Sequence, residues 1–315
     1  MYTDNIDKQK CFVSEVVYIH NNSQSEVEEF FGNIINNLNS RFENAEVVIV
    51  VDDDSVTDYA AIKKILDNDS NGDTIISIVR LAYYQGLEAA MCAGIDMAVG
   101  DFVFEFDSIN SNYDKDIPVK MYEKTKEGFD IVAATDKNDK LFSRIFYRII
   151  NSGKANKIQH DTIRLVSRRA LNRVKKMNTS VLYRKYQYMS SGLPYAEVEY
   201  EPIRKIARKR SKGEKSDRWN SGINYMMMYT RTIEKATTVL CCIFLIVTIA
   251  VGIWALYSLG YDTNLASGWV SLMGIISFGF FGIFLMIAFL FKYINIILNI
   301  NTKKMDYIVE SVDKL

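Results

Sequence analysis

The amino-acid sequence predicts an α/β domain with a mostly parallel sheet, followed by an interface helix and a transmembrane hairpin of two helices. Over residues 1–235, apolar β-rich runs alternate with amphipathic stretches, which is typical of a sheet covered by helices. Two long runs without charge, 236–261 and 263–291, follow this region. A strongly basic segment, 204–218, precedes them and indicates a boundary.

The elements of the α/β domain follow one another as strand, helix and strand. Each expected strand is short, apolar and rich in β-branched or aromatic residues. Each expected helix carries apolar or small residues at helical spacing. The strands are expected at residues 11–19, 45–51, 74–81 and 101–106, and the helices at residues 26–38 and 86–100.

Composition excludes several classes of protein. The chain has 315 residues with 38 basic and 38 acidic side chains, so its net charge of zero gives no overall attraction to nucleic acid. Four cysteines are too few for a disulfide scaffold, and two histidines lie too far apart for a metalloprotease helix. The N-terminus lacks the basic start and apolar run of a signal peptide, so the first domain is expected in the cytosol.

Both uncharged runs are long enough to cross a bilayer, which takes about 20 residues. The alternative, two buried helices of a soluble protein, would need helices of this length to be apolar on every side. Basic residues precede the first run and follow the second, whereas the connection near Asp262 has none. By the positive-inside rule, both ends of the hairpin are expected in the cytosol.

The basic segment 204–218 has eight basic and two acidic residues, a net charge of +6. Such a segment beside a membrane sets the topology, and it can also attract anionic headgroups or hold a lipid phosphate. Both interpretations stay open from the sequence. Apolar residues then recur at helical spacing over 219–233, as in a helix that lies in the membrane interface.

Acidic residues follow two of the expected strands. Asp52, Asp53 and Asp54 come directly after the second strand, and Asp107 follows the strand that ends at Phe106. In an open sheet of this kind, ligands bind beyond the carboxyl ends of the strands. A run of carboxylates can also be a helix cap or a solvated turn. Two acidic strand ends in one sheet favour a binding site.

An ordered set of segments carries a resemblance to a known family. The first strand ends in VYIHNN, the second in VDDDS, residues 80–101 read RLAYYQGLEAAMCAGIDMAVGD, and residues 160–171 read HDTIRLVSRRAL. With two apolar runs and the tail KKMDYIVE, this order resembles the family 2 inverting glycosyltransferases of GT-A fold, a Rossmann-like arrangement. It is most similar to the branch that acts on polyprenyl phosphates, which includes dolichol-phosphate mannose synthase and bacterial bactoprenol glycosyltransferases.

The chain departs from this family where the family's chemistry is concentrated. Asp54 replaces a glycine, and the second Asp of the DxD metal motif falls on Ile109, which cannot bind a cation. The Gly-x-Ser-Lys segment survives only at residues 211–212, and the arginine of the next strand is replaced at residues 135–136. These departures favour altered or lost handling of the glycosyl donor.

The resemblance implies a role for each matched position. Asp107 and Asp161 would be catalytic, with Asp161 beside the acceptor and the reacting sugar. Mg²⁺ or Mn²⁺ would bind weakly to Asp107 and Glu105, whose side chains share one face of a strand. Alternatively, Glu105 pairs with a base inside the sheet, and Asp161 caps a helix or a turn. The donor nucleotide would contact Asn21, Asp52, Asp53 and Arg80, and the acceptor phosphate would contact Arg164, Arg208 and Lys212.

The function favoured by this resemblance is transfer of a sugar from a UDP-sugar to polyprenyl (undecaprenyl) phosphate, with inversion, in bacterial envelope glycan assembly. A second interpretation is a catalytically weakened homologue that acts as a scaffold or as a lipid- or nucleotide-binding partner. A third, transfer to a growing glycan, is disfavoured because two helices make a poor conduit. The implied partners include the anionic bilayer and further copies of the chain, such as a tetramer, but no nucleic acid.

The expected protein spans the inner membrane twice, with the catalytic domain and both termini in the cytosol. The segments are a glycosyltransferase domain (1–203), a juxtamembrane segment with the interface helix (204–235), a first transmembrane helix (236–261), an external loop (262–268), a second transmembrane helix (269–291) and a cytosolic tail (292–315).

Overall fold

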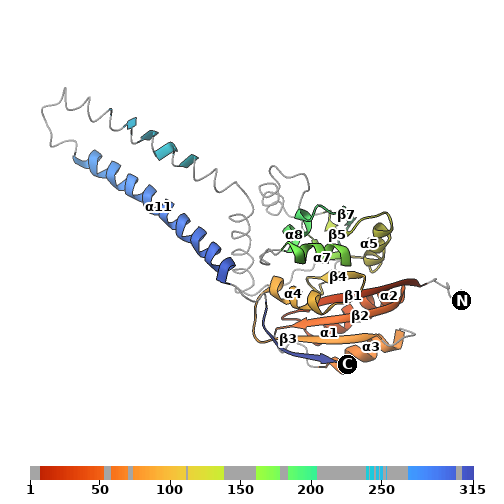
Figure 1. Ribbon diagram of the computed structural model, residues 1–315. Coiled ribbons are helices and arrows are strands. Elements are labelled where there is room, and N and C mark those ends of the chain that lie inside the picture. The colour runs from red at the N-terminus through yellow and green to blue at the C-terminus, as the bar shows by residue number, and fades with distance from the viewer. Residues whose placement is uncertain are drawn as a thin grey trace. The chain divides into compact units, whose positions relative to one another are not determined.

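The computed structural model divides the chain into two compact units, residues 1–217 with 305–315 and residues 218–304 (Figure 1). The predicted basic segment and interface helix lie outside the described residues. The structure describes residues 8–52, 58–69, 74–110, 113–137, 161–177, 184–203, 269–302 and 307–315, with part of 239–253.

The first unit is built around one sheet, in the order β7-β5-β6-β4-β1-β2-β3-β8. β1 pairs in parallel with β2 and β4, and β2 with β3, so the centre of the sheet is parallel, as predicted. β6 and β8 run antiparallel to their neighbours, so the whole sheet is mixed. The strands are β1 (Gln9–Ile19), β2 (Phe42–Val51), β3 (Ile75–Leu81), β4 (Phe102–Phe106), β5 (Ile131–Asp136), β6 (Asp161–Ser167), β7 (Tyr195–Tyr200) and β8 (Val309–Lys314).

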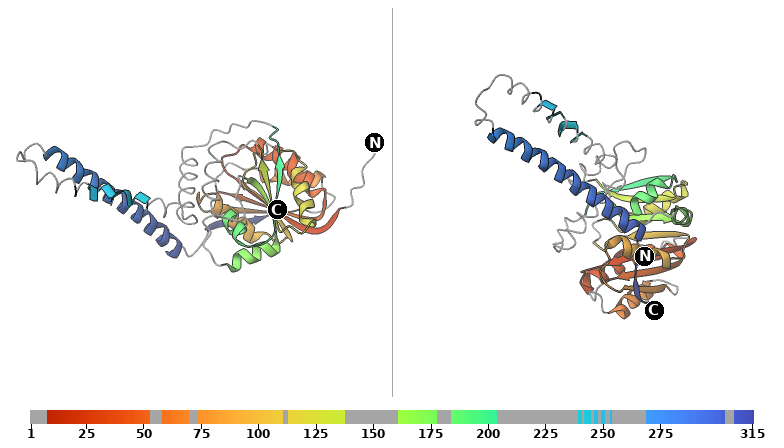
Figure 2. Two further views of the ribbon diagram at one scale, coloured as in Figure 1. Left: turned by 90° about the horizontal axis from the view of Figure 1, so that it is seen from above. Right: turned by 60° about the vertical axis from the view of Figure 1, so that its left-hand side comes forward.

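Helices cover both faces of this sheet (Figure 2), which confirms the predicted α/β class. One face packs against α1 (Gln24–Phe30), the π-helical η1 (Phe31–Ile35), α2 (Asn36–Asn39), α3 (Tyr59–Asp69) and α5 (Ile117–Lys126). The other face packs against α4 (Leu87–Met97), α7 (Arg168–Lys176) and α8 (Arg184–Ser190).

The central strands are apolar on both faces because both faces are covered. On β1, Val13 and Val17 enter one core, and Val16 and Tyr18 enter the other. Such near-continuous apolar runs are typical of parallel strands buried on two sides. The polar residues that follow these strands are therefore concentrated at the edge of the sheet where the strands end.

Small residues let α4 approach the sheet closely. Gly94 lies against β1 and β2, where a Cβ would stand 2.7 Å from Val50 Cγ2. Gly86 precedes the helix with a φ of 86°, a left-handed conformation that glycine adopts without strain. This turn lets the chain enter α4 soon after β3 ends.

The C-terminal residues form an edge strand. No strand was predicted within the tail at 292–315. β8 pairs antiparallel with β3, with Val312 opposite Val79. The Gln85 side chain holds the residue before this strand from both sides. It donates to the Ile308 carbonyl at 2.7 Å and accepts from the Ile308 N–H at 2.8 Å. The end of the chain is thus part of the first unit.

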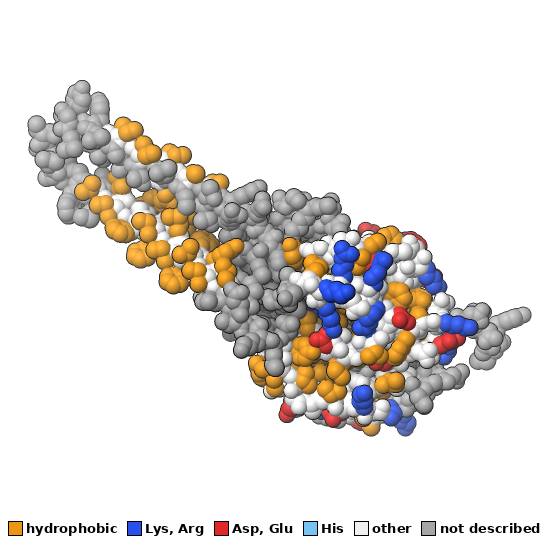
Figure 3. All heavy atoms as spheres, viewed as in Figure 1, with side chains coloured by type: hydrophobic (Ala, Val, Ile, Leu, Met, Phe, Trp, Pro, Cys, Tyr) orange, Lys and Arg blue, Asp and Glu red, His pale blue; other side chains and the backbone are white. Residues whose placement is uncertain are grey.

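The second unit contains α11 (Trp269–Thr302), which starts where the second transmembrane helix was predicted and continues past its expected end at Phe291. Within the described residues, one helical segment, Gly274–Ile294, has the length and apolar character to cross a bilayer, with a mean hydropathy of 2.5. Large apolar side chains on it are exposed, Phe284 and Phe291 among them (Figure 3).

The first predicted span is described only in part, and it is helical at the positions described between 239 and 253. Its Phe244 ring lies 5.1 Å from the ring of Phe278 on α11. Gly282 lies directly beneath the same ring, where a Cβ would clash with it. A small residue at this position permits the two apolar segments to pack closely.

Candidate active site

Charged side chains gather on the α8 side of the sheet, where β4 and β6 are neighbours. The antiparallel register places Glu105 directly opposite Arg164. Residues two apart on a strand share a face, so Asp107 lies on the same side as Glu105, as predicted. Two further cations, Arg184 and Lys185, come from α8. Segments far apart in the sequence thus build one cluster.

Arg184 bridges three carboxylates. Its Nη1 donates to Glu105 Oε2 at 2.5 Å, and its Nη2 donates to Asp107 Oδ1 at 2.7 Å. Its Nε and its backbone N–H both donate to Glu88 Oε2 of α4, at 2.9 and 3.0 Å. The planar guanidinium holds its donors in a fixed fork, so this side chain is anchored from several directions. It is only 2% exposed.

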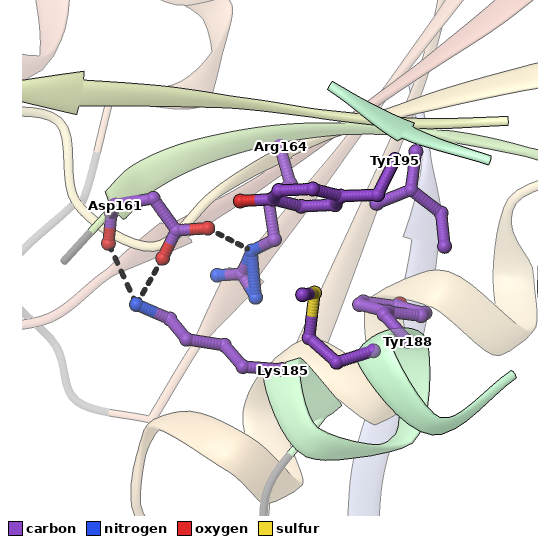
Figure 4. A pocket seen from close by; sticks show the side chains of 7 residues that line it. Asp161, Arg164, Lys185, Tyr188 and Tyr195 are labelled. Carbon is purple, nitrogen blue, oxygen red and sulfur yellow. Dashed lines mark hydrogen bonds and ion pairs between the residues drawn. The ribbon is translucent and has the colours of Figure 1, made fainter. Parts of the chain in front are cut away.

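Arg164 lies on the other side of the Asp107 carboxylate. Its Nη2 donates to Asp107 Oδ2, and its Nη1 lies 3.5 Å from Glu105 Oε2. Its Nε lies 3.2 Å from Asp161 Oδ2 (Figure 4). Lys185 Nζ pairs with the same Asp161 carboxylate and donates to its backbone carbonyl at 3.0 Å. Asp161 is the first residue of β6, so it does not cap a helix, and two cations hold its carboxylate.

The cations set the ionisation of the buried carboxylates. Burial alone would raise the pKa of Asp107, but Arg164, Arg184 and Lys185 outweigh it and hold this pKa well below its usual range. Burial raises the pKa of Glu105 despite the same arginines. Tyr188 donates its hydroxyl to Glu105 Oε1, and burial raises the pKa of Tyr188 well above its usual value. Asp107 is therefore held in its ionised form by these cations.

A small pocket opens beside this cluster (Figure 4). Charged groups from β6 and α8 form part of its wall, and aromatic and apolar side chains form the rest. A ligand that combines an anionic group with an apolar or ring-shaped part would match such a lining. The lining residues are Ile131, Asp161, Arg164, Lys185, Tyr188, Met189 and Tyr195.

A second polar group lies where β1 and β2 end. Asp52 Oδ1 is 2.7 Å from His20 Nδ1, and Asp52 Oδ2 accepts from the Tyr18 hydroxyl at 2.6 Å. The His20 ring lies 4.9 Å from the ring of Tyr84. Asn21 has a φ of 53°, and its amide nitrogen lies 3.1 Å from His20 Nε2. This edge offers the hydrogen-bonding and stacking groups that a nucleobase needs.

The structure brings together only some of the residues singled out from the sequence. Glu105, Asp107, Asp161 and Arg164 form one cluster, and Asn21 lies near Asp52 through His20. Arg80 pairs in register with Val51, so its side chain points to the opposite face from Asp52, and its guanidinium lies over the Tyr59 ring. Asp53, Arg208 and Lys212 lie outside the described residues.

Sequence reasoning missed several residues that contact these carboxylates. His20 lies within the quoted segment VYIHNN, where a histidine beside acidic strand ends was a usable signal. Arg184 and Lys185 carry no such signal, because they lie on a short helix outside every matched segment. Glu88 lies in the expected helix at residues 86–100, which was identified by its small residues and not by its charge.

Comparisons with known proteins define the class. Residues 14–190, more than half of the chain, match the model of glycosyl transferase family 2. The chain therefore belongs to glycosyltransferase family 2. An uncharacterised glycosyltransferase of Synechocystis sp. is 31% identical to it over 111 residues, which are 32% of this chain and 35% of the relative. The match thus spans about a third of that relative's length.

The solved structures to which the chain is similar include a mannosyltransferase and a glucosyl-3-phosphoglycerate synthase. A mannosyltransferase of Pyrobaculum calidifontis, in complex with GDP-mannose and Mn²⁺, is 11% identical, covers 94% of this chain and 88% of its own, and has a TM-score of 0.46. Glucosyl-3-phosphoglycerate synthase of Mycobacterium tuberculosis, with Mn²⁺, UDP and phosphoglyceric acid, is 12% identical, covers 69% of this chain and 78% of its own, and has a TM-score of 0.49.

The residues at the predicted metal position do not fit a divalent cation. Both Asp107 oxygens already face guanidinium groups, and two like unit charges 4 Å apart repel by about 4 kcal/mol at an effective dielectric constant of about 20. Ile109, at the position of the second DxD carboxylate, is 4% exposed and packs in the apolar core. Among the described residues, no group of three or more His, Cys, Asp or Glu side chains could hold a metal ion.

Proposed function

We propose that this protein is a membrane-anchored glycosyltransferase that transfers a sugar from a UDP-sugar to polyprenyl phosphate. The observation that carries the proposal is the path of the chain. A family 2 domain leads into apolar segments, and the chain then returns to the same domain as β8. An active domain held at both ends of a membrane hairpin stays close to an acceptor whose lipid tail lies in the bilayer.

The return of the chain also bears on the number of membrane crossings. β8 and β3 are hydrogen-bonded neighbours, so residues 8–203 and 307–315 lie on one side of any membrane. The chain between them must then cross an even number of times. If Gly274–Ile294 is one span, the apolar run at 236–261 is the natural second, and the contact of Phe244 with Phe278 supports this pairing.

Charge distribution favours the cytosolic leaflet of the inner membrane for the active domain. Basic residues flank the hairpin at its two inner ends, and the segment 204–218 carries a net charge of +6. Reporters fused after Leu315 and inserted near Asn264 test this arrangement. We expect the first to be cytosolic and the second to be external. A cytosolic reporter near Asn264 would remove the hairpin from the proposal.

In the proposed reaction, an oxygen of the acceptor phosphate forms a bond to the anomeric carbon. The bond between that carbon and the donor diphosphate breaks, and its electron pair leaves with the nucleoside diphosphate. The acceptor is already an anion, so the protein needs no strong general base. Positioning and neutralisation of charge provide most of the acceleration in such reactions.

The described residues divide these tasks between two places. The edge at His20, Asp52 and Tyr84 binds the nucleobase and ribose, with Asn21 beside it. The cations and aromatic rings that line the small pocket at Asp161 contact the phosphate and sugar portions. Arg208 and Lys212 of the basic segment add positive charge for the lipid phosphate.

Transfer of radiolabel in membranes tests this function. A panel of UDP- and GDP-sugars is incubated with membranes containing the full chain and added polyprenyl phosphate, and label in the lipid extract is counted. We expect label from a UDP-sugar and none with Asp161→Asn. Membranes with the Lys124→Gln variant, changed at an exposed side chain of α5, serve as the matched control and should retain transfer.

A second candidate function is a nucleotide- or lipid-binding scaffold without transfer activity. It is favoured by the same cluster, because the Asp107 and Asp161 carboxylates are already paired with cations and Ile109 breaks the DxD motif. Nucleotide binding without label transfer from any member of the panel would select this function.

A further inference from the structure

Two arginines of the protein face the Asp107 carboxylate. Family 2 enzymes with a DxD motif bind a metal ion at this position. Oδ1 accepts from Arg184 Nη2 at 2.7 Å, and Oδ2 accepts from Arg164 Nη2. The Asp107 side chain is 8% exposed and both arginine side chains are 2% exposed. Each oxygen of the carboxylate is thus paired with a buried guanidinium.

These guanidinium groups are fixed by contacts that do not involve Asp107. Arg184 is tied to Glu88 through both its Nε and its backbone N–H, and to Glu105 through Nη1. Arg164 is held by Asp161 and lies directly across the strand pair from Glu105. An incoming divalent cation would have to approach Asp107 against two cations that are anchored elsewhere.

The charges of the cluster are also nearly balanced without a metal ion. Its four carboxylates, Glu88, Glu105, Asp107 and Asp161, face three cations, Arg164, Arg184 and Lys185. Divalent cations bind where several carboxylate oxygens are free to converge with net negative charge. At Asp107, both carboxylate oxygens are already paired with guanidinium groups, so neither is free to bind a metal ion.

We propose that Arg164 and Arg184 replace the divalent cation at Asp107, so that this protein binds its nucleotide sugar without a metal ion. Arg164 lines the pocket together with Lys185, and these two groups supply the positive charge that the leaving diphosphate needs. Arg184 acts as a positioning residue, because it holds Asp107 and Glu105 in place. The inference rests on the proposed function, since it concerns the diphosphate of the same donor.

The test uses the full chain in detergent and two measurements that do not depend on turnover. Calorimetry gives the affinities for UDP and GDP in EDTA and in millimolar Mn²⁺. Electron paramagnetic resonance of free Mn²⁺ gives metal binding directly. For wild type, we expect nucleotide affinities that differ by less than about twofold between the two conditions, and no saturable Mn²⁺ binding. Affinity at least about tenfold weaker in EDTA would overturn the proposal.

Variants identify the residue that occupies the metal position. Arg184→Gln removes one cation from Asp107, and we expect it to gain Mn²⁺ binding together with a rise in melting temperature on adding Mn²⁺. Arg169→Gln removes an arginine from an ion pair with Asp130, away from the cluster, and should gain neither. Absence of the gain in folded Arg184→Gln overturns the role of Arg184.

Two further outcomes separate this inference from the proposed function. Saturable Mn²⁺ binding by wild type that Asp107→Asn abolishes overturns the inference and leaves the transferase function standing. If neither UDP nor GDP binds in either condition, the proposed function fails. The Mn²⁺ measurements on wild type and Asp107→Asn still decide whether the arginines exclude a metal ion. They also stand if Arg184→Gln does not fold.

Discussion

The two faces of the central sheet each bury a glutamate, and the surroundings of these two glutamates differ. Glu105 on β4 and Glu15 on β1 are fully buried on neighbouring strands. Glu105 faces α8, where Arg184 and Tyr188 donate to it. Glu15 faces the opposite core, and neither of its oxygens has a hydrogen-bond partner among the described residues.

This difference shows that burial alone does not mark a functional carboxylate. Burial raises the pKa of Glu15 well above its usual value, with no cation to oppose it. Burial also raises the pKa of Glu105, but Arg164 and Arg184 oppose this rise. The same arginines keep the neighbouring Asp107 ionised. Asp107 stays ionised because β6 and α8 supply cations beside it. Both faces contain an apolar core, but only the face with Glu105 places described cations beside its buried glutamate.

The largest effect on stability is expected from replacing Arg184, the cation that pairs with three carboxylates on the α8 face. Arg184→Gln leaves Glu88, Glu105 and Asp107 short of a partner, so the free energy of unfolding should fall by about 3–5 kcal/mol. Denaturant unfolding of the full chain in detergent measures this loss. Arg169→Gln, whose side chain is 67% exposed, should cost far less. Equal losses in the two variants would contradict the special position of Arg184.

Replacing the glutamate of the opposite face should have the reverse sign. Glu15→Leu removes a buried polar group without a described partner, so it should raise the free energy of unfolding by about 1–3 kcal/mol at neutral pH. Glu105→Leu, the matched change on the other face, should lower it because two arginines lose a carboxylate. A loss of stability in Glu15→Leu would reveal a hydrogen bond to Glu15 in solution.

The pH dependence of stability separates the faces in another way. The pKa of Glu15 is raised in the folded protein, so its carboxyl costs no stability below the unfolded pKa of about 4.3. As the pH rises from there to the folded pKa, the unfolded state releases its proton first. The free energy of unfolding then falls by up to about 1.4 kcal/mol per pH unit.

Comparison with Glu15→Gln isolates this term, because the carboxylates of the α8 face titrate alike in both proteins. We expect the difference in unfolding free energy between the variant and wild type to grow from about pH 4.5 upward. Parallel pH profiles would show that Glu15 has its usual pKa in the folded protein.

The smallest effect is expected from an ion pair on the surface. Lys124 donates to Glu127 at 3.0 and 2.9 Å on α5, yet both side chains are well exposed to water. Lys124→Gln should lower the free energy of unfolding by less than about 0.5 kcal/mol. The same denaturant experiment measures this loss of stability. A loss as large as that of Arg184→Gln would show that burial does not explain the difference between the buried and the exposed ion pairs.

Much of the first unit could be predicted from local patterns. The strands around Val13, Val47 and Ile78 follow from β-rich apolar runs, and Glu105 and Asp107 share a face because side chains alternate along a strand. The position of Asp52 and Asp107 at strand ends needed only the same information. In each case neighbouring residues carry the whole signal.

The partners of those carboxylates could not be predicted from such patterns. Arg164 contacts Glu105 because of the antiparallel register of β4 and β6. Arg184 contacts Glu105 and Asp107 because α8 packs on the sheet. Electrostatic pairing depends on distance in space, which sequence spacing does not report. The prediction of a metal at Asp107 and Glu105 therefore rested on the carboxylates alone and could not include the cations that face them.

The C-terminal end shows the same division. The sequence by itself determined that long apolar runs precede a short polar tail, because length and hydropathy are local properties. Only the tertiary structure decided that residues 309–314 form an edge strand beside β3, since that strand finds its hydrogen-bond partners more than 200 residues earlier in the chain. Backbone pairing at a sheet edge places little demand on side chains, so the tail needed no distinctive pattern to fold there.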